Sequence, residues 1–156
     1  MSLLMFPAFK LRELMAPPHV INRRVFEAFL EVDNENSRNV SKDLIKLYFS
    51  QADKLINTIG QKLCVYPQIV LVFVITSFRS QNRIQSCDHE IRTLNDSAST
   101  FGIVQVEECC QKLESAFCQS NIVGAEQALL NMKSLLVDLR LAHSEAKRYL
   151  AEWYGI

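Results

Sequence analysis

The chain has 156 residues, 17 Lys plus Arg against 17 Asp plus Glu, and 49% hydrophobic residues. This length fits one domain with a sizeable core. The zero net charge removes the electrostatic basis for binding a phosphate backbone, so we expect no nucleic-acid partner. With only four Gly and four Pro, the composition favours helices over a turn-rich β-sandwich.

The five cysteines are an odd number and contain no C-x-x-C pair, which argues against a zinc site or a disulfide framework. We expect buried free thiols in a reducing compartment, and neither a metal nor a cofactor. The cysteines are Cys64, Cys87, Cys109, Cys110 and Cys118.

No membrane segment is expected either. Residues 1–9 are apolar but lack the basic start and small-residue cleavage site of a secretory signal. The most apolar run, Val65–Phe78, is interrupted by Pro67 and is shorter than the roughly 20 residues that span a bilayer.

The N-terminal part divides at Pro17-Pro18 into a leader, residues 1–19, and a single helical domain, residues 20–156. Apolar residues recur every three or four positions over 20–33 and predict a first helix there. They are Val20, Ile21, Val25, Phe29 and Val32. A polar connector follows, and Asn39 or Ser41 is available as the N-cap of the next helix.

Four further amphipathic segments predict helices over about residues 40–63, 82–97, 103–119 and 122–152. Ser99 or Thr100 followed by Gly102 marks a break or a tight packing point, and Asn121 is placed to cap the last helix. The predicted fold is therefore all-α, an antiparallel four-helix bundle preceded by one or two N-terminal helices.

The run Ile69–Ile75 departs from this pattern, because its β-branched residues favour a strand for which the chain offers no partner. We interpret residues 65–80 as an apolar insert, packed over the bundle or forming a buried helical turn.

Catalytic motifs are scarce. The sequence contains no G-x-S-x-G, no Gly-rich phosphate loop and no H-E-x-x-H, and its histidines, His19, His89 and His143, are far apart. We do not expect an enzyme with turnover of its own.

The segment from Asp88 to Ile103, DHEIRTLNDSASTFGI, resembles the signature H-x-L-K-G-S-S-x-x-x-G-A of histidine-containing phosphotransfer (HPt) domains. Residues 26–48 resemble the N-terminal half of plant-type members, and Gly102, Val106 and Cys110 keep the spacing that those proteins show after their motif. The resemblance implies a helical mediator of a His-to-Asp phosphorelay, in which an exposed histidine accepts a phosphoryl group from a receiver-domain aspartate.

Aligned without gaps from Gly102, the motif places Leu94 at its leucine, Asn95 at its lysine, Asp96 at its glycine and Arg92 at the acceptor histidine. Ser97 then matches the first motif serine. Arginine cannot accept the phosphoryl group, since its guanidinium stays protonated and offers only hydrogen-bond donors. A carboxylate at position 96 would repel an incoming phosphate, and the lysine that could balance the phosphate is missing.

A second alignment starts from His89, with Arg92 at the lysine position. It requires three extra residues before Gly102, which rotate the acceptor by about 60° around the helix and shift it by about one turn. Helices tolerate such insertions poorly, so this alignment is the alternative.

The resemblance implies docking on receiver domains of hybrid sensor histidine kinases and response regulators of the cytokinin relay, through an apolar patch around the acceptor helix, in cytoplasm and nucleus. We expect a pseudo-phosphotransfer protein without an acceptor histidine. The alternatives are an active carrier that uses His89, and a helical adaptor with no relay role.

Overall fold

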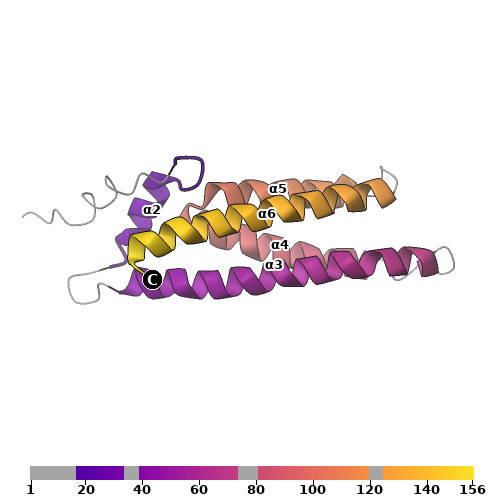
Figure 1. The fold of residues 1–156 in the computed structure, drawn as a ribbon, viewed down its shortest axis with the longest axis horizontal. Helices are drawn as coiled ribbons and strands as arrows, with labels where there is room; N and C mark the ends of the chain where they lie inside the picture. Colours follow the sequence, from indigo (N-terminus) through magenta and orange to yellow (C-terminus); the bar gives the residue numbers. More distant parts are fainter. Residues whose placement is uncertain (1–16, 34–38, 74–80, 120–124) are drawn as a thin grey trace, which may run out of the picture.

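The structure, a computed structural model, describes residues 17–33, 39–73, 81–119 and 125–156. Its helices are α2 (Arg23–Leu30), α3 (Val40–Phe73), α4 (Gln81–Phe101), α5 (Val104–Gln119) and α6 (Ala125–Tyr154). The four long helices lie side by side, consecutive ones running in opposite directions, with α2 at the end where α3 begins and α6 ends (Figure 1). The predicted all-α, antiparallel four-helix bundle with an additional N-terminal helix is confirmed.

The packing order decides which helices share a face. Helix α3 packs against α4 and α6, and α5 packs against the same two helices. Helices α4 and α6 are therefore diagonal to each other, and their outer faces lie on opposite sides of the bundle (Figure 1).

The predicted first helix is shorter than the apolar pattern suggested. Asn22 is its N-cap, and its side chain accepts hydrogen bonds from the backbone N–H groups of Arg24 and Val25. Val20 and Ile21 were wrongly expected to be helical. Both are buried: Val20 ends a turn that begins at Pro17, and Ile21 forms an isolated antiparallel bridge with Ile103. The N–H of Val104 donates to the carbonyl of Val20 at 3.0 Å.

At the start of α3, Asn39 holds the predicted capping position, but Ser41 lies inside the first turn. Asp33, eight residues earlier, accepts the Ser41 N–H at 2.9 Å and also the Ser41 hydroxyl. The Tyr154 hydroxyl in turn donates to Ser41 Oγ at 2.9 Å, which ties the end of α6 to the start of α3. The interpretation of Ser41 as an N-cap is therefore corrected.

Helix α3 continues to Phe73 rather than ending near residue 63, so the first part of the expected insert, residues 65–73, is regular helix and not strand. The favourable helical hydrogen bonding of the preceding turns outweighs a local β preference when no partner strand is available. Several predicted features lie outside the described residues: leader residues 1–16, most of the connector, the rest of the insert and the Asn121 cap.

The predicted apolar stripes of the long helices supply the core, whereas Val32 of the first predicted helix is 44% exposed. On α5 the stripe of Val106, Cys109, Cys110, Leu113 and Phe117 is buried as predicted. Each fully buried Leu or Ile stabilises the fold by about 1.5–3 kcal/mol through removal of apolar surface from water. Core members that are fully buried include Ile45, Ile59, Ile91, Leu94, Ile103, Leu113 and Leu139.

A polar group is buried within this core. His143 on α6 is 5% exposed, and its Nε2 lies 3.0 Å from Asp53 Oδ1 on α3, whose other oxygen accepts from Lys147 at 2.7 Å. Burial lowers the pKa of His143 below 6.5, although the hydrogen bond and charge of Asp53 act in the opposite direction. Burial alone would raise the pKa of Asp53, but the hydrogen bonds from Lys147 and His143 outweigh it and hold that pKa below 3.8.

The lowered pKa of His143 predicts a loss of stability as the pH falls from 7 to 5. The unfolded chain binds this proton near pH 6.5 and the folded chain only at lower pH, so the free energy of unfolding decreases across this window. In His143→Phe, which keeps a ring beside Tyr48 and Phe49, we expect a smaller decrease. Urea unfolding of both proteins at pH 7 and pH 5 measures the decrease in the free energy of unfolding. A decrease equal to that of the wild type would assign the pH dependence to other groups.

Candidate functional site

The outer face of α4 carries the positions that the motif singles out. Successive helical residues are about 100° apart, so Leu94 and Ala98 share one face while His89, Arg92 and Asp96 share the opposite one. Leu94 and Ala98 are fully buried, and the other three are exposed. None of the large apolar side chains from residue 87 to residue 101 is exposed. The apolar docking patch that we expected around this helix is therefore absent from that part of α4, and the face is polar.

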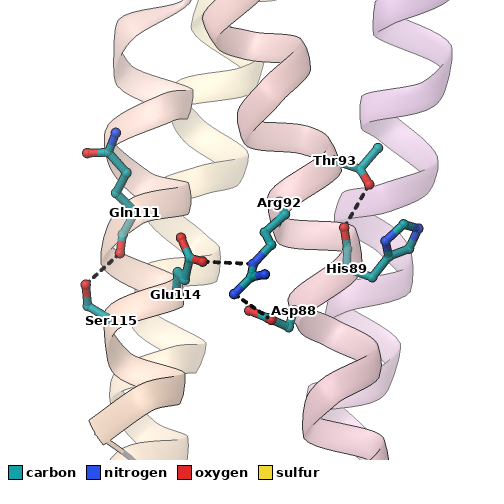
Figure 2. A network of polar contacts seen from close by, with 7 residues as sticks. All are labelled: Asp88, His89, Arg92, Thr93, Gln111, Glu114 and Ser115. Carbon is teal, nitrogen blue, oxygen red and sulfur yellow. Dashed lines mark hydrogen bonds and ion pairs between the residues drawn. The ribbon is translucent and has the colours of Figure 1, made fainter.

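Arg92, at the acceptor position of the gapless alignment, is held between two carboxylates (Figure 2). Its Nε lies 3.0 Å from Glu114 Oε1 on α5, and its Nη2 lies 3.1 Å from Asp88 Oδ2, one turn earlier on α4. The arginine side chain is 62% exposed, so these pairs contribute little to stability, about 0–1 kcal/mol each. Their effect is to direct the guanidinium toward α5.

The two positions after the motif leucine also depart from a phosphate carrier. Asn95 is partly buried, and its Oδ1 has no hydrogen-bond partner among the described residues. Asp96 is exposed one turn beyond Arg92. Asp88 and Glu114 contact the guanidinium, and Asp96 adds a further negative charge to the same face of α4. The hydroxyl of Ser97 donates to the carbonyl of Thr93 at 2.8 Å and is thus used within the helix.

His89 is exposed on α4, and its carbonyl accepts the Thr93 hydroxyl at 2.8 Å. Its imidazole lies on the side of α4 nearer to α3, away from the guanidinium of Arg92 (Figure 2). In the alternative alignment Arg92 would supply the cation beside His89. The guanidinium instead faces α5, so the structure does not bring these two groups together.

Leu94 and Gly102 belong to the packing of α4 and not to its outer face. Gly102 ends the helix with φ +71°, as the predicted break requires. Its carbonyl accepts the N–H of Asn22 at 2.6 Å. An added Cβ would lie 2.9 Å from the Asn22 carbonyl oxygen and 3.0 Å from Val25 Cβ. Gly102 is therefore the point where the end of α4 meets Asn22 and the first turn of α2.

The cysteines divide into two groups. Cys87, Cys109 and Cys110 are buried free thiols, as predicted, whereas Cys64 and Cys118 are exposed and correct that prediction. Burial raises the pKa of Cys110 to about 12 and that of Cys87 to about 11, so both stay protonated and unreactive at neutral pH.

Sequence reasoning missed Glu114, because 22 residues separate it from Arg92 and only the packing of α4 on α5 joins them. It also missed the ion pair between Lys62 Nζ on α3 and Glu90 Oε1, 2.7 Å apart. For Glu114 the sequence did carry a signal. Its seven-residue spacing from Glu107 places both carboxylates on one face of α5, beside the buried stripe.

Two other kinds of site are absent from the parts of the chain that the structure describes. No group of three or more His, Cys, Asp or Glu side chains there is placed to hold a metal ion. Within the same residues, no helix has the length and apolar character needed to cross a membrane.

A family model for the Hpt domain matches residues 43–147, a range that runs from α3 to α6 and includes the whole of α4. A comparison with curated proteins found no match. Hpt domains mediate phosphotransfer in two-component signalling and interact with receiver domains. Because the matched range covers more than half of this chain, the chain belongs to the Hpt domain family.

Proposed function

We propose that this Hpt protein is a pseudo-phosphotransfer protein of the plant-type cytokinin relay. It docks on receiver domains of hybrid sensor histidine kinases and response regulators without carrying phosphate, and competes with active carriers for them. We place it in cytoplasm and nucleus, where such relays operate. The observation that carries the proposal is the position of Arg92, exposed at the acceptor site between Asp88 and Glu114.

The chemistry of this position supports binding without transfer. Phosphoryl transfer requires a nucleophile with a free lone pair, and a guanidinium has none at any pH at which the protein is folded. The carboxylates of Asp88 and Glu114 beside Arg92, and that of Asp96 on the same face, also oppose a phosphoryl group, and Asn95 supplies no cation to offset them. The packing positions Leu94 and Gly102, by contrast, are intact. The helix is thus kept in place while the reactive group is missing.

The polar outer face of α4 has a consequence for docking. Because Asp88, Arg92 and Asp96 contribute charge to this face, affinity for a receiver domain depends on electrostatic complementarity. We expect receiver binding to weaken as ionic strength rises.

The decisive test incubates the full chain with radiolabelled, phosphorylated receiver domains of hybrid kinases and response regulators, and measures both binding and label. We expect micromolar binding and no acid-labile, base-stable label on the protein. Label that His89→Ala removes would instead support the active carrier, which the exposure of His89 favours. Absence of binding to every receiver domain would leave the helical adaptor.

A further inference from the structure

The outer face of α6 presents apolar side chains that no described part of the chain covers. Leu130, Val137 and Leu141 are 56%, 53% and 64% exposed, while Met132, Leu136 and Leu139 on the opposite face are buried in the core. A helix with apolar residues on both faces has a second surface suited to packing.

The spacing on this face follows a heptad pattern. Alternating steps of four and three residues give the seam of a two-stranded coiled coil. Its members, all exposed, are Leu130, Ser134, Val137, Leu141, Ser144 and Arg148. At 1.5 Å per residue the seam is about 27 Å long. The two serines are small enough to let a second helix approach closely.

The charged residues beside the seam are sorted by sign. One flank carries Lys133, Arg140 and Lys147, and the other carries Asp138, Glu145 and Glu152. Lys147 pairs with Asp53. No ion pair among the described residues involves the other flanking charges, Lys133, Arg140, Asp138 and Glu145. The guanidinium of Arg140 lies against Gly60 of α3. Lys133, Asp138 and Glu145 are therefore the charges available to a partner beside the seam, whose apolar members are Leu130, Val137 and Leu141.

We propose that this face is a dimer interface, in which α6 pairs in parallel with α6 of a second copy of the chain. In a parallel pair each basic flank residue meets the acidic residue five positions later on the other copy. All three such pairs are complementary: Lys133 with Asp138, Arg140 with Glu145, and Lys147 with Glu152. In an antiparallel pair each flank would meet itself, with like charges opposed at every flank position, whereas a parallel pair opposes like charges only at Arg148 within the seam. The flanking charges therefore favour the parallel direction.

The dimer goes beyond the proposed function and has a consequence for it. Because α4 is diagonal to α6, a two-fold axis along the outer face of α6 leaves both α4 faces pointing outward (Figure 1). One dimer then presents two separate sites to receiver domains.

Sedimentation equilibrium of the full chain at low and high salt tests the dimer. We expect a micromolar dimer at low salt, weaker at high salt, and at least a tenfold loss of association in Leu141→Glu. Leu141 is 64% exposed, so the variant should keep the wild-type thermal unfolding temperature. A protein that is monomeric up to several hundred micromolar, or association that this variant leaves unchanged, would overturn the proposal.

A charge exchange tests the pairing itself. Lys133→Glu and Asp138→Lys each convert two attractive contacts of the dimer into repulsive ones, and we expect each to weaken dimerisation about three- to tenfold. The double variant exchanges the signs and should recover the wild-type dissociation constant. Additive weakening in the double variant would contradict the pairing.

Cross-linking tests the direction, in a background of Cys64→Ser and Cys118→Ser that removes the exposed thiols. In a parallel dimer of the Ser134→Cys variant, the cysteine at position 134 of one chain forms a disulfide with the cysteine at position 134 of the other chain. Cross-linking only in a mixture of Ser134→Cys and Ser144→Cys chains would show an antiparallel dimer and refute the parallel arrangement.

Discussion

Arg92→His is expected to convert the protein into a phosphoryl acceptor. The substitution places an imidazole on the outer face of α4, at the position that the gapless alignment assigns to the acceptor, where the present side chain is 62% exposed. A neutral imidazole offers the lone pair that a guanidinium lacks. Incubated with a phosphorylated receiver domain, this variant should gain acid-labile, base-stable label at least tenfold above the wild-type background.

Transfer to Arg92→His should be slow, because Asp88 and Glu114 stay beside the new imidazole and favour its protonated form. The protonated ring has no free lone pair, so we expect the rate of labelling to increase between pH 6 and pH 8. Adding Asn95→Lys and Asp96→Gly supplies a cation and removes a carboxylate, and this triple variant should be labelled faster than the single one.

His89→Ala is the matched control for this experiment, since His89 is an exposed histidine on the same helix. Label on Arg92→His should persist when His89→Ala is added. If wild-type protein is labelled and His89→Ala abolishes that label, the acceptor lies three residues earlier and the pseudo-phosphotransfer proposal is wrong. If Arg92→His binds receiver domains but gains no label, the gapless alignment does not describe the docked geometry.

Periodicity was sufficient for the fold, since each buried stripe could be read from three- and four-residue spacing. The predictions that failed involve contacts between distant parts of the chain. Val20 and Ile21 fit helical spacing, but Ile21 forms a bridge with Ile103 and Val20 accepts a hydrogen bond from Val104. Ser41 resembles a cap, but its N–H and hydroxyl donate to Asp33. A local sequence pattern does not show which distant residue will bond to a segment and change its conformation.

The same limit applies to the candidate site. The motif alignment selected Arg92, Asn95 and Asp96 within one predicted helix, and the structure shows Arg92 and Asp96 on its exposed face. The direction of the guanidinium could not be predicted, because it depends on Glu114 of the neighbouring helix. That direction separates the guanidinium of Arg92 from the imidazole of His89, and both alignments remain compatible with the residue types.

The largest loss of stability is expected from Gly102→Ala, because this glycine combines a left-handed backbone with a crowded environment. A residue with a Cβ at φ +71° is strained by about 1–2 kcal/mol. The Cβ would also approach the backbone oxygen of Asn22 to 2.9 Å, and a backbone atom held by its own hydrogen bond cannot move aside easily. We expect the free energy of unfolding to fall by about 2–4 kcal/mol, measured by urea denaturation.

Gly155→Ala separates the two contributions. Gly155 also has a left-handed backbone, φ +63°, but an added Cβ there meets nothing within 4 Å. Its substitution should therefore cost about 1 kcal/mol, the backbone strain alone. The difference between the two variants measures the contact between the end of α4 and the segment before α2. Equal losses would mean that Gly102 is retained only for its backbone conformation and that the contact with Asn22 and Val25 yields readily to a methyl group.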